Sequence, residues 1–338
     1  LHRDLVVLGF DGSYDRVAAF ARDWRQQQRE ADNRASRGTY IPLIFAPGEA
    51  FQFDWSEDWA RVGPRQMKLQ VAHFKLCHSR VFMLRAYPLQ THEMLFDAHN
   101  HCFRALGGIP QRGIYDNMKT AVDKVGRGKQ RQVNARFRAM VSHFMFESDF
   151  CNPAAGWEKG QVEKNVRDAR YRLWHDAPAF RDLAALNIWL EQRCKALWHE
   201  IRHPEQTNRT IAEVYADEQA SLMVMPPPFD GFIEHAKRVS PTCLIVFERN
   251  RYSVPAALAN QVISLRVYAN RLVMVARAEV IAEHERIFSR DHSSPGKTSY
   301  DWRHYLAVVQ RKPGALRNGA PFANTERYDH LREVRHVD

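Results

Sequence analysis

Apolar positions near the start of the chain repeat with the spacing of a helix. They fall at i, i+3, i+4 and i+7, on one face of an amphipathic helix: Val17, Phe20, Ala21 and Trp24. Ser13 is a typical N-cap for a helix over residues 14–28. A shorter apolar run and a glycine-containing turn precede it, which predicts a helical, helix-turn-helix-like DNA-binding segment over residues 1–38 with Arg16 available for phosphates. A plain helical hairpin fits the pattern equally well.

From residue 45 to residue 205, short runs typical of strands are followed by strand and helix patterns in alternation. Strands are expected at 50–55, 67–76, 80–87, 113–116 and 145–150, and helices at 91–106, 134–144, 158–174 and 184–198. Three strands in succession, then helices between short strands, predict an α/β domain with a mixed sheet flanked by helices.

The pattern changes after three consecutive prolines at positions 226–228. We expect residues 206–235 to form a helical, proline-rich linker. Short apolar strands separated by polar turns then predict a small β-barrel over residues 236–290. A last helix near residues 301–310 and a tail complete the segment 291–338.

Composition adds a basic excess to this picture. The 338 residues carry 49 Lys and Arg against 39 Asp and Glu, a formal charge of +10, which favours a polyanionic partner. No run reaches the ~20 consecutive apolar residues of a membrane span, and the charged start is unlike a signal peptide. Because the first residue is Leu1 and not Met, we expect the chain to begin inside a longer protein. Five scattered cysteines without CxxC spacing predict reduced thiols in a cytoplasmic protein.

Three acidic residues stand where a sheet and a helix can bring them together. Asp54 lies within an aromatic strand, Asp116 ends another strand, and Glu163 lies in the first turns of a glycine-containing helix. Converging carboxylates are hard oxygen ligands for Mg²⁺. Two such ions can activate water and stabilise the leaving oxygen of a phosphoryl displacement. Each acid taken singly also fits a surface or capping role.

The sequence around these acids resembles the core of DDE transposases and retroviral-type integrases. The matching stretches are Phe51-Gln52-Phe53-Asp54, Gly113-Ile114-Tyr115-Asp116-Asn117, Cys151-Asn152-Pro153 and Gly160-Gln161-Val162-Glu163-Lys164-Asn165. The resemblance is strongest to IstA-type insertion-sequence transposases, and residues 249–255 and 311–316 extend it beyond the core. The spacing from Asp116 to Glu163 is longer than in the general integrase pattern, which leaves Glu158 and Glu147 as rivals for the third acid.

The resemblance implies an RNase H-like fold and a specific chemistry. Asp54, Asp116 and Glu163 would bind two Mg²⁺ ions, for which Mn²⁺ can substitute. The protein would cut transposon-end DNA and join the freed 3′-hydroxyl to target DNA, as a homo-oligomer on DNA in the bacterial cytosol and nucleoid. The resemblance also implies an AAA+ ATPase helper. An RNase H-like nuclease without strand transfer and a non-enzymatic DNA-binding protein are the alternatives.

Basic residues are concentrated beside the proposed acids. Residues 124–138 hold six basic and no acidic residues, which predicts a mobile loop that closes on a DNA backbone; a solvated loop is the simpler alternative. Two arginines also share the helix face of Glu163, although Arg167 could instead pair with that acid. The predicted DNA-binding residues are Lys124, Arg127, Lys129, Arg131, Arg136, Arg138, Lys159, Arg167, Arg170 and Arg16.

Two other chemistries are excluded by residue spacing. His99, His101 and Cys102 crowd together, and no second cysteine pair accompanies them, so a zinc-finger site is not expected. The string at residues 126–129 lacks the leading glycine and the following Ser or Thr of a P-loop. We therefore expect no ATP hydrolysis by this chain itself.

Overall fold

Two structural units make up the chain, Leu1–Ile44 and Phe45–Asp338. The computed structural model describes residues 2–35, 43–116, 122–125, 131–151, 173–174, 177–288, 296–319 and 321. Most of the predicted helix at 158–174 therefore lies outside the described residues.

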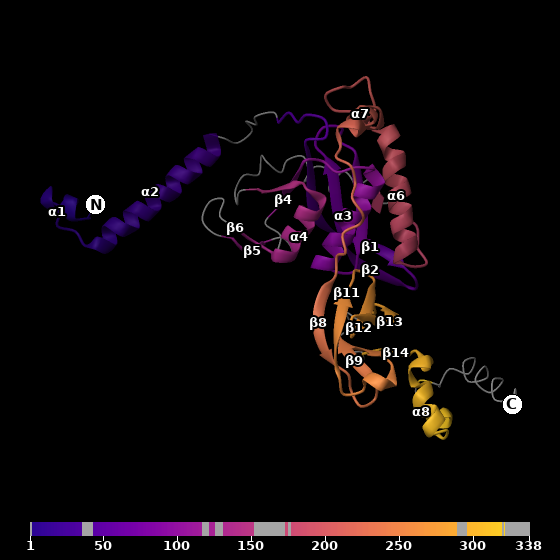
Figure 1. Cartoon of the computed structure of the whole chain (residues 1–338). Coiled ribbons are helices and arrows are strands. Elements are labelled where there is room, and N and C mark those ends of the chain that lie inside the picture. The colour runs from indigo at the N-terminus through magenta and orange to yellow at the C-terminus, as the bar shows by residue number, and fades with distance from the viewer. Residues whose placement is uncertain are drawn as a thin grey trace. The chain divides into compact units, whose positions relative to one another are not determined.

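Helices α1 (His2–Val7) and α2 (Tyr14–Ala35) form the described part of the first unit (Figure 1). The N–H of Arg16 donates to Ser13 Oγ at 3.4 Å, and Gly9 in the turn takes a φ of 93°, which glycine adopts without strain. On the predicted apolar face Val17 is buried, whereas Phe20 is 72% exposed. The two helices are confirmed, and DNA binding by them stays a prediction.

A five-stranded mixed sheet is the centre of the second unit. Its strands are β1 (Ala50–Val62), β2 (Arg65–Leu76), β3 (Phe82–Tyr87), β4 (Arg112–Tyr115) and β7 (Glu147–Phe150), in the order β3-β2-β1-β4-β7. The pairs β1–β2 and β2–β3 are antiparallel, and β1–β4 and β4–β7 are parallel. Helices flank this sheet, which confirms the predicted α/β class with a mixed sheet.

One face of the sheet packs an aromatic core against α3 (His92–Leu106) and α4 (Ala135–Phe144). Phe51 stacks on Phe74 with ring centroids 4.2 Å apart. The predicted ends of these helices are partly confirmed: Gly107 closes α3 with a φ of 69°, and the Asn134 side chain accepts the first N–H groups of α4. Thr91 precedes α3 but its side chain makes no capping hydrogen bond.

Helix α6 (Leu183–Glu200) packs along the edge strand β3. Asn187 of α6 accepts the N–H of Ala86 at 2.7 Å and donates to its carbonyl at 2.9 Å. These two bonds satisfy the outward backbone groups of Ala86 in the edge strand β3. After α6 come α7 (Ile211–Glu218) and a 3₁₀ turn, η2 (Gln219–Ser221). The buried carboxylate of Glu218 accepts two backbone N–H groups, from Gly48 and Ser79.

Two sheets built mainly from antiparallel strand pairs follow the three consecutive prolines. The first, in the order β13-β12-β11-β8, consists of β8 (Ile233–Arg238), β11 (Val262–Val267), β12 (Arg271–Ala276) and β13 (Glu279–Glu285). The second, in the order β14-β10-β9, consists of β9 (Leu244–Phe247), β10 (Asn250–Ser253) and β14 (Thr298–Ser299). A short η3 (Ala256–Leu258) lies between them in sequence. We call residues 233–299 the C-terminal β-module.

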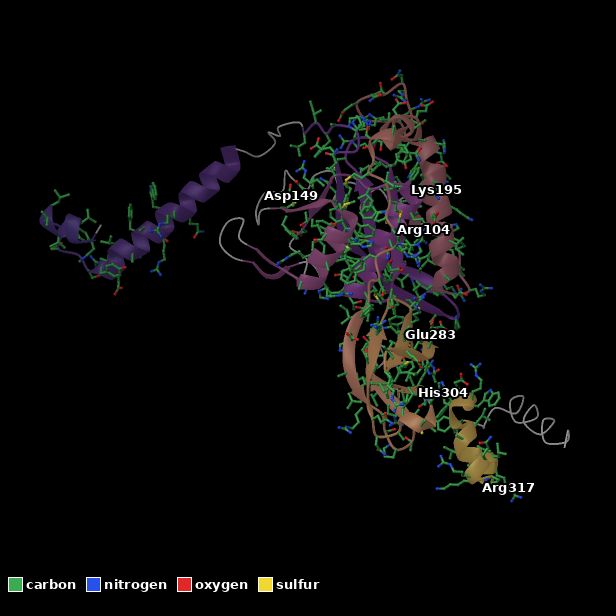
Figure 2. The ribbon with its side chains drawn as sticks, viewed as in Figure 1. Arg104, Asp149, Lys195, Glu283, His304 and Arg317 are labelled. Atoms are coloured by element: carbon green, nitrogen blue, oxygen red, sulfur yellow. The ribbon has the colours of Figure 1, made fainter. Side chains whose placement is uncertain are left out.

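The β-module differs from the predicted barrel. Among the described residues the two sheets share an apolar core that includes Tyr252 and Leu265, but their strand pairing does not close a barrel. Strand β8 also begins within the segment expected to be a linker. The chain then forms η4 (Trp302–Tyr305), α8 (Leu306–Arg311) and α9 (Ala315–Asn318), where one helix was expected; Figure 2 labels His304 and Arg317 on this segment.

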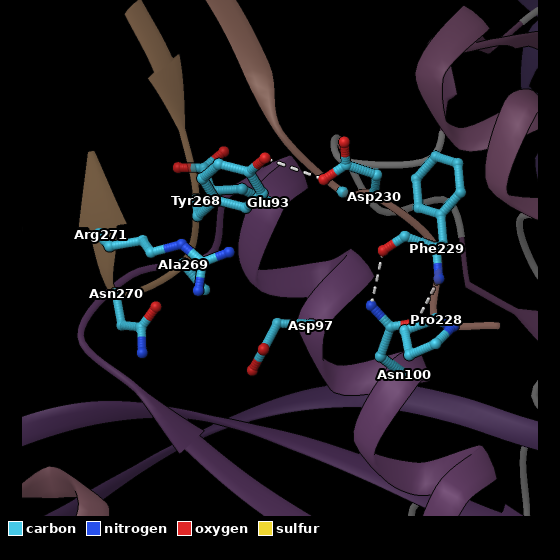
Figure 3. A pocket seen from close by; sticks show the side chains of 11 residues that line it. Glu93, Asp97, Asn100, Pro228, Phe229, Asp230, Tyr268, Ala269, Asn270 and Arg271 are labelled. Carbon is cyan, nitrogen blue, oxygen red and sulfur yellow. Dashed lines mark hydrogen bonds between the residues drawn. The ribbon is translucent and has the colours of Figure 1, made fainter. Parts of the chain in front are cut away.

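Two arginines attach the β-module and its linker to the core helices. Arg286 donates to Glu93 Oε1 of α3 at 2.6 Å and to Glu248 Oε1 at 2.8 Å. Arg136 of α4 donates to the carbonyl of Phe232 at 2.6 Å. A cavity of about 390 Å³ lies between α3, the linker and the turn before β12. Figure 3 shows its lining, where Asn100 forms a reciprocal pair of hydrogen bonds with the backbone of Phe229.

Candidate active site

Strand register places Asp54 and Asp116 side by side. Strands β1 and β4 are parallel, with Phe53 paired to Tyr115, so the two acids are the next residues of adjacent strands. Strands in a sheet lie about 4.8 Å apart. Phe53 and Tyr115 pack together on the α3 side, and side chains alternate along a strand. The two carboxylates therefore belong to the opposite face.

The backbone N–H of the next residue holds the Asp54 carboxylate. The N–H of Trp55 donates to Asp54 Oδ1 at 2.8 Å, and Asp54 and Asp116 are both half-buried. The rigid position of Asp54 follows from β1, a 13-residue strand paired on both sides. Two adjacent, partly accessible carboxylates on a rigid sheet are a suitable partial ligand set for a hard divalent cation.

The third predicted acid lies outside the described residues, as does its rival Glu158. The other rival can be placed. Glu147 is paired to Arg112 at the start of β4, whereas Asp116 follows the end of that strand. Four residues of parallel strand span about 13 Å. Glu147 is thus on the wrong end of the sheet to share an ion with Asp54 and Asp116, and Glu163 stays the predicted third acid.

Neighbouring strand residues complete the described surroundings of the acid pair. Cys151 is buried and its N–H donates to the carbonyl of Tyr115 at 2.9 Å, which places it beside Asp116 on the next strand. Asp149 of β7, labelled in Figure 2, forms an ion pair with Arg112 at 2.8 Å. These contacts fix β7 against β4 at the edge of the site.

A buried polar chain on the same sheet face was missed by the sequence analysis. Ser56 Oγ donates to Asp58 Oδ2 at 2.9 Å and lies 2.8 Å from His73 Nε2. All three residues are buried, and His73 is the cross-strand partner of Asp54. The alternation of polar residues at positions 52, 54, 56 and 58 was the available signal in the sequence.

The basic run beside the acids is not one loop. Strands β5 (Val122–Val125) and β6 (Arg131–Val133) pair as an antiparallel hairpin, and α4 begins at Ala135. Lys124 and Arg131 belong to the two strands of this hairpin. The following predicted DNA-binding residues lie outside the described residues: Arg127, Lys129, Lys159, Arg167 and Arg170.

The remaining predicted DNA-binding arginines have different surroundings. Arg16 of α2 and Arg138 of α4 are exposed. The guanidinium of Arg136 instead contacts the linker: it donates to the carbonyls of Phe232 and Asp230 and lies 5.1 Å from the Phe232 ring centroid. Two intramolecular acceptors engage Nη2 of this guanidinium, so Arg136 holds the linker, and its contact with phosphate stays a prediction.

The histidine cluster has a packing role. His99 is buried in the aromatic core, where Nδ1 bonds the carbonyl of Leu95 and Nε2 bonds the Tyr115 hydroxyl, each at 2.8 Å. Burial lowers the pKa of His99 to about 4. Within the described ranges no three metal-ligating side chains converge. No described helix is long and apolar enough to cross a membrane.

Comparison with known proteins agrees with the motifs around these acids. A family model for the Mu transposase C-terminal domain matches residues 224–294, which include most of the β-module. A Pseudomonas aeruginosa transposase for insertion sequences IS1326/IS1353 is 64% identical over 323 residues, covering 96% of this chain and 64% of that protein. This chain thus spans less than two thirds of that relative's length.

A more distant relative is covered over most of its length. A transposase for insertion sequence element IS21 from Pseudomonas aeruginosa is 30% identical over 283 residues, covering 83% of this chain and 70% of that protein. The HTLV-2 integrase catalytic core solved with magnesium covers 51% of this chain and 98% of its own, with 12% identity and a TM-score of 0.36, too low to support a statement about function. The identity and coverage of the IS21 transposase establish that the chain belongs to the IS21 family of insertion-sequence transposases.

Proposed function

We propose that this chain carries the catalytic part of a transposase that cuts transposon-end DNA and joins the cut end to target DNA. The observation that carries this proposal is the register of β1 and β4, which aligns Asp54 with Asp116 on one sheet face. The sheet order β3-β2-β1-β4-β7 and its pattern of parallel and antiparallel pairs support an RNase H-like assignment for the core.

Asp54 and Asp116 would hold Mg²⁺ together with Glu163, and Mn²⁺ would substitute. Carboxylate oxygens are the ligands that Mg²⁺ prefers, and Asp54 and Asp116 are both half-buried and so remain partly accessible. A pair of Mg²⁺ ions supplies activation of water or a 3′-hydroxyl and stabilisation of the leaving oxygen. The protein orients the carboxylates: the Trp55 N–H fixes one oxygen of Asp54.

DNA would be held by cations of both units. In the second unit the described candidates are Lys124 and Arg131 on the β5–β6 hairpin and exposed Arg138 on α4, and in the first unit the described candidate is exposed Arg16 on α2. The further candidates are Arg127, Lys129, Lys159, Arg167 and Arg170. Phosphate contacts release counterions, so replacing one such cation lowers the salt dependence of DNA binding by about one ion. We further propose a homo-oligomer on DNA and an AAA+ ATPase helper, as the family implies.

The test replaces each acid by its amide in the full-length protein. D54N and D116N should each abolish Mg²⁺-dependent end cleavage and strand transfer while DNA binding is retained. The matched control is E57Q, since Glu57 is an exposed carboxylate on the same strand that pairs with Lys68 at 2.6 Å. Unchanged cleavage by D54N would refute the catalytic assignment. Cleavage by the wild type without strand transfer from pre-cut ends would indicate a nuclease instead.

A further inference from the structure

The sheet face that carries Asp54 is polar in a place where it is also buried. Along β1 the residues on this face are Gln52, Asp54, Ser56 and Asp58, and all except Asp54 are at most 7% exposed. The α3 face of the same strand carries Phe51, Phe53 and Trp55. Burying polar side chains costs free energy unless each has hydrogen-bond partners. The hydrogen bonds on this face therefore indicate the structural role of each polar residue.

The hydrogen bonds of Ser56 determine the state of His73. A carboxylate only accepts, so the single hydroxyl proton of Ser56 is donated to Asp58 at 2.9 Å. At the 2.8 Å contact with His73, Ser56 Oγ must then accept, and the proton lies on Nε2. The chain from Asp58 through Ser56 thus fixes both the orientation and the tautomer of a buried imidazole.

This fixed imidazole lies next to a proposed metal ligand. Asp54 is paired with His73 across the antiparallel β1–β2 ladder. Side chains directly opposite one another in such a ladder have Cβ atoms about 5 Å apart. On the other flank, Asp116 follows β4. Asp54 therefore lies between a second carboxylate and an imidazole whose Nε2 is bonded to Ser56, and the Trp55 N–H is bonded to one of the Asp54 oxygens.

We propose that His73, held by Ser56 and Asp58, is a positioning residue that restricts the Asp54 carboxylate to the orientation required for divalent-metal binding. This inference rests on the proposed function, because it assumes that Asp54 is a metal ligand. Residues that orient a metal ligand commonly change metal affinity or activity by about 10- to 100-fold when they are replaced.

The primary test measures metal binding without catalysis. Mn²⁺ binding to the full-length protein is followed by the electron paramagnetic resonance signal of free Mn²⁺, alongside the Mg²⁺ concentration that half-saturates end cleavage. S56A breaks the polar chain with the loss of one oxygen atom. We expect S56A and H73L to weaken Mn²⁺ binding about 10-fold and to raise the required Mg²⁺ concentration in parallel.

Two further variants separate positioning from a loss of stability. Ser79 is a fully buried serine at the β2–β3 turn, away from the acid pair, so S79A is the matched control and should bind Mn²⁺ as the wild type does. H73Q carries an amide N–H that can replace Nε2–H, and it should restore most of the affinity lost in H73L. Thermal unfolding of all four variants identifies any general destabilisation.

The outcomes distinguish this inference from the proposed function. If D54N abolishes Mn²⁺ binding while S56A and H73L bind it normally, the positioning role is wrong and the proposed metal site stands. If D54N itself binds Mn²⁺ like the wild type, the proposed function and the inference both fail. Equal losses in S79A and S56A would also overturn the positioning role, because they would report stability alone.

Discussion

Arg286 provides the sharpest test of how the β-module is attached to the core. Its side chain is 1% exposed and bonds Glu93, itself 6% exposed, at 2.6 Å, with Glu248 at 2.8 Å on its other side. It also donates to the carbonyl of Tyr268 and lies 4.8 Å from the Phe288 ring centroid. The substitution Arg286→Met keeps much of the volume and removes the charge and every donor.

The expected loss of folding free energy follows from the carboxylates that R286M leaves without their cation. Glu248 is partly exposed and can be hydrated, whereas Glu93 would keep a buried charge without its cation. Removing one partner of a buried ion pair costs about 3–5 kcal/mol. The double variant E93M/R286M removes both charges, so it should be more stable than R286M alone, with a coupling free energy of about 2 kcal/mol.

Urea unfolding of the full-length protein measures these free energies, and limited proteolysis within residues 226–232 reports detachment of the β-module. Arg271 is the matched control, because it is about half exposed and its Glu283 contact is 3.6 Å, so R271M should cost less than ~1 kcal/mol. An R286M protein as stable as R271M, with no coupling to position 93, would refute the view that this ion pair joins the two parts.

Three smaller changes test other contacts. N187L leaves the backbone N–H and C=O of Ala86 buried without their partner and should cost about 2–4 kcal/mol in urea unfolding; a cost near zero would contradict the role of Asn187 at the sheet edge. Burial holds the pKa of His99 at about 4, below the ~6.5 of unfolded histidine, so unfolding takes up a proton between these values. The contribution of His99 to the free energy of unfolding is complete above about pH 6.5 and falls by up to about 1.4 kcal/mol per pH unit as the pH drops towards 4. The free energy of unfolding of H99L should therefore depend less steeply on pH in this range than that of the wild type. R136M should increase proteolysis within residues 226–232 and leave the salt dependence of DNA binding unchanged, whereas R138M should do the reverse; weaker salt dependence in R136M would restore its predicted phosphate contact.

Much of the local structure follows from sequence pattern. The periodicity of Val17, Phe20 and Trp24 predicts α2, and Asn134 and Gly107 lie at helix ends where expected. These features depend on interactions within a few residues, so each short stretch carries its own signal. The motifs around Asp54 and Asp116 likewise identify the acid pair, which strand register then brings together.

Pairing between distant segments was harder to predict. The run at residues 124–138 has the composition of a loop. In the structure its first residues belong to β5, which pairs with β6 as a hairpin, and its last residues belong to the start of α4. Among the described residues, the segment predicted as a barrel forms two sheets. The sequence does not distinguish these architectures, because the alternation of inward and outward side chains along a strand is the same in a barrel and in packed sheets. Sequence pattern carries no information about whether the last strand returns to the first.

By itself, the sequence determined the family resemblance, the order of most strands and helices and the choice of candidate acids, since these depend on residue type and local spacing. Only the tertiary structure decided which side chains meet across strands and between segments. His73 faces Asp54 through the β1–β2 register, Arg136 donates to the carbonyl of Phe232 in the linker, and Arg286 reaches Glu93 from 193 residues away. Such contacts depend on the packing of the whole unit, where a buried polar group must find its partner wherever in the chain that partner lies.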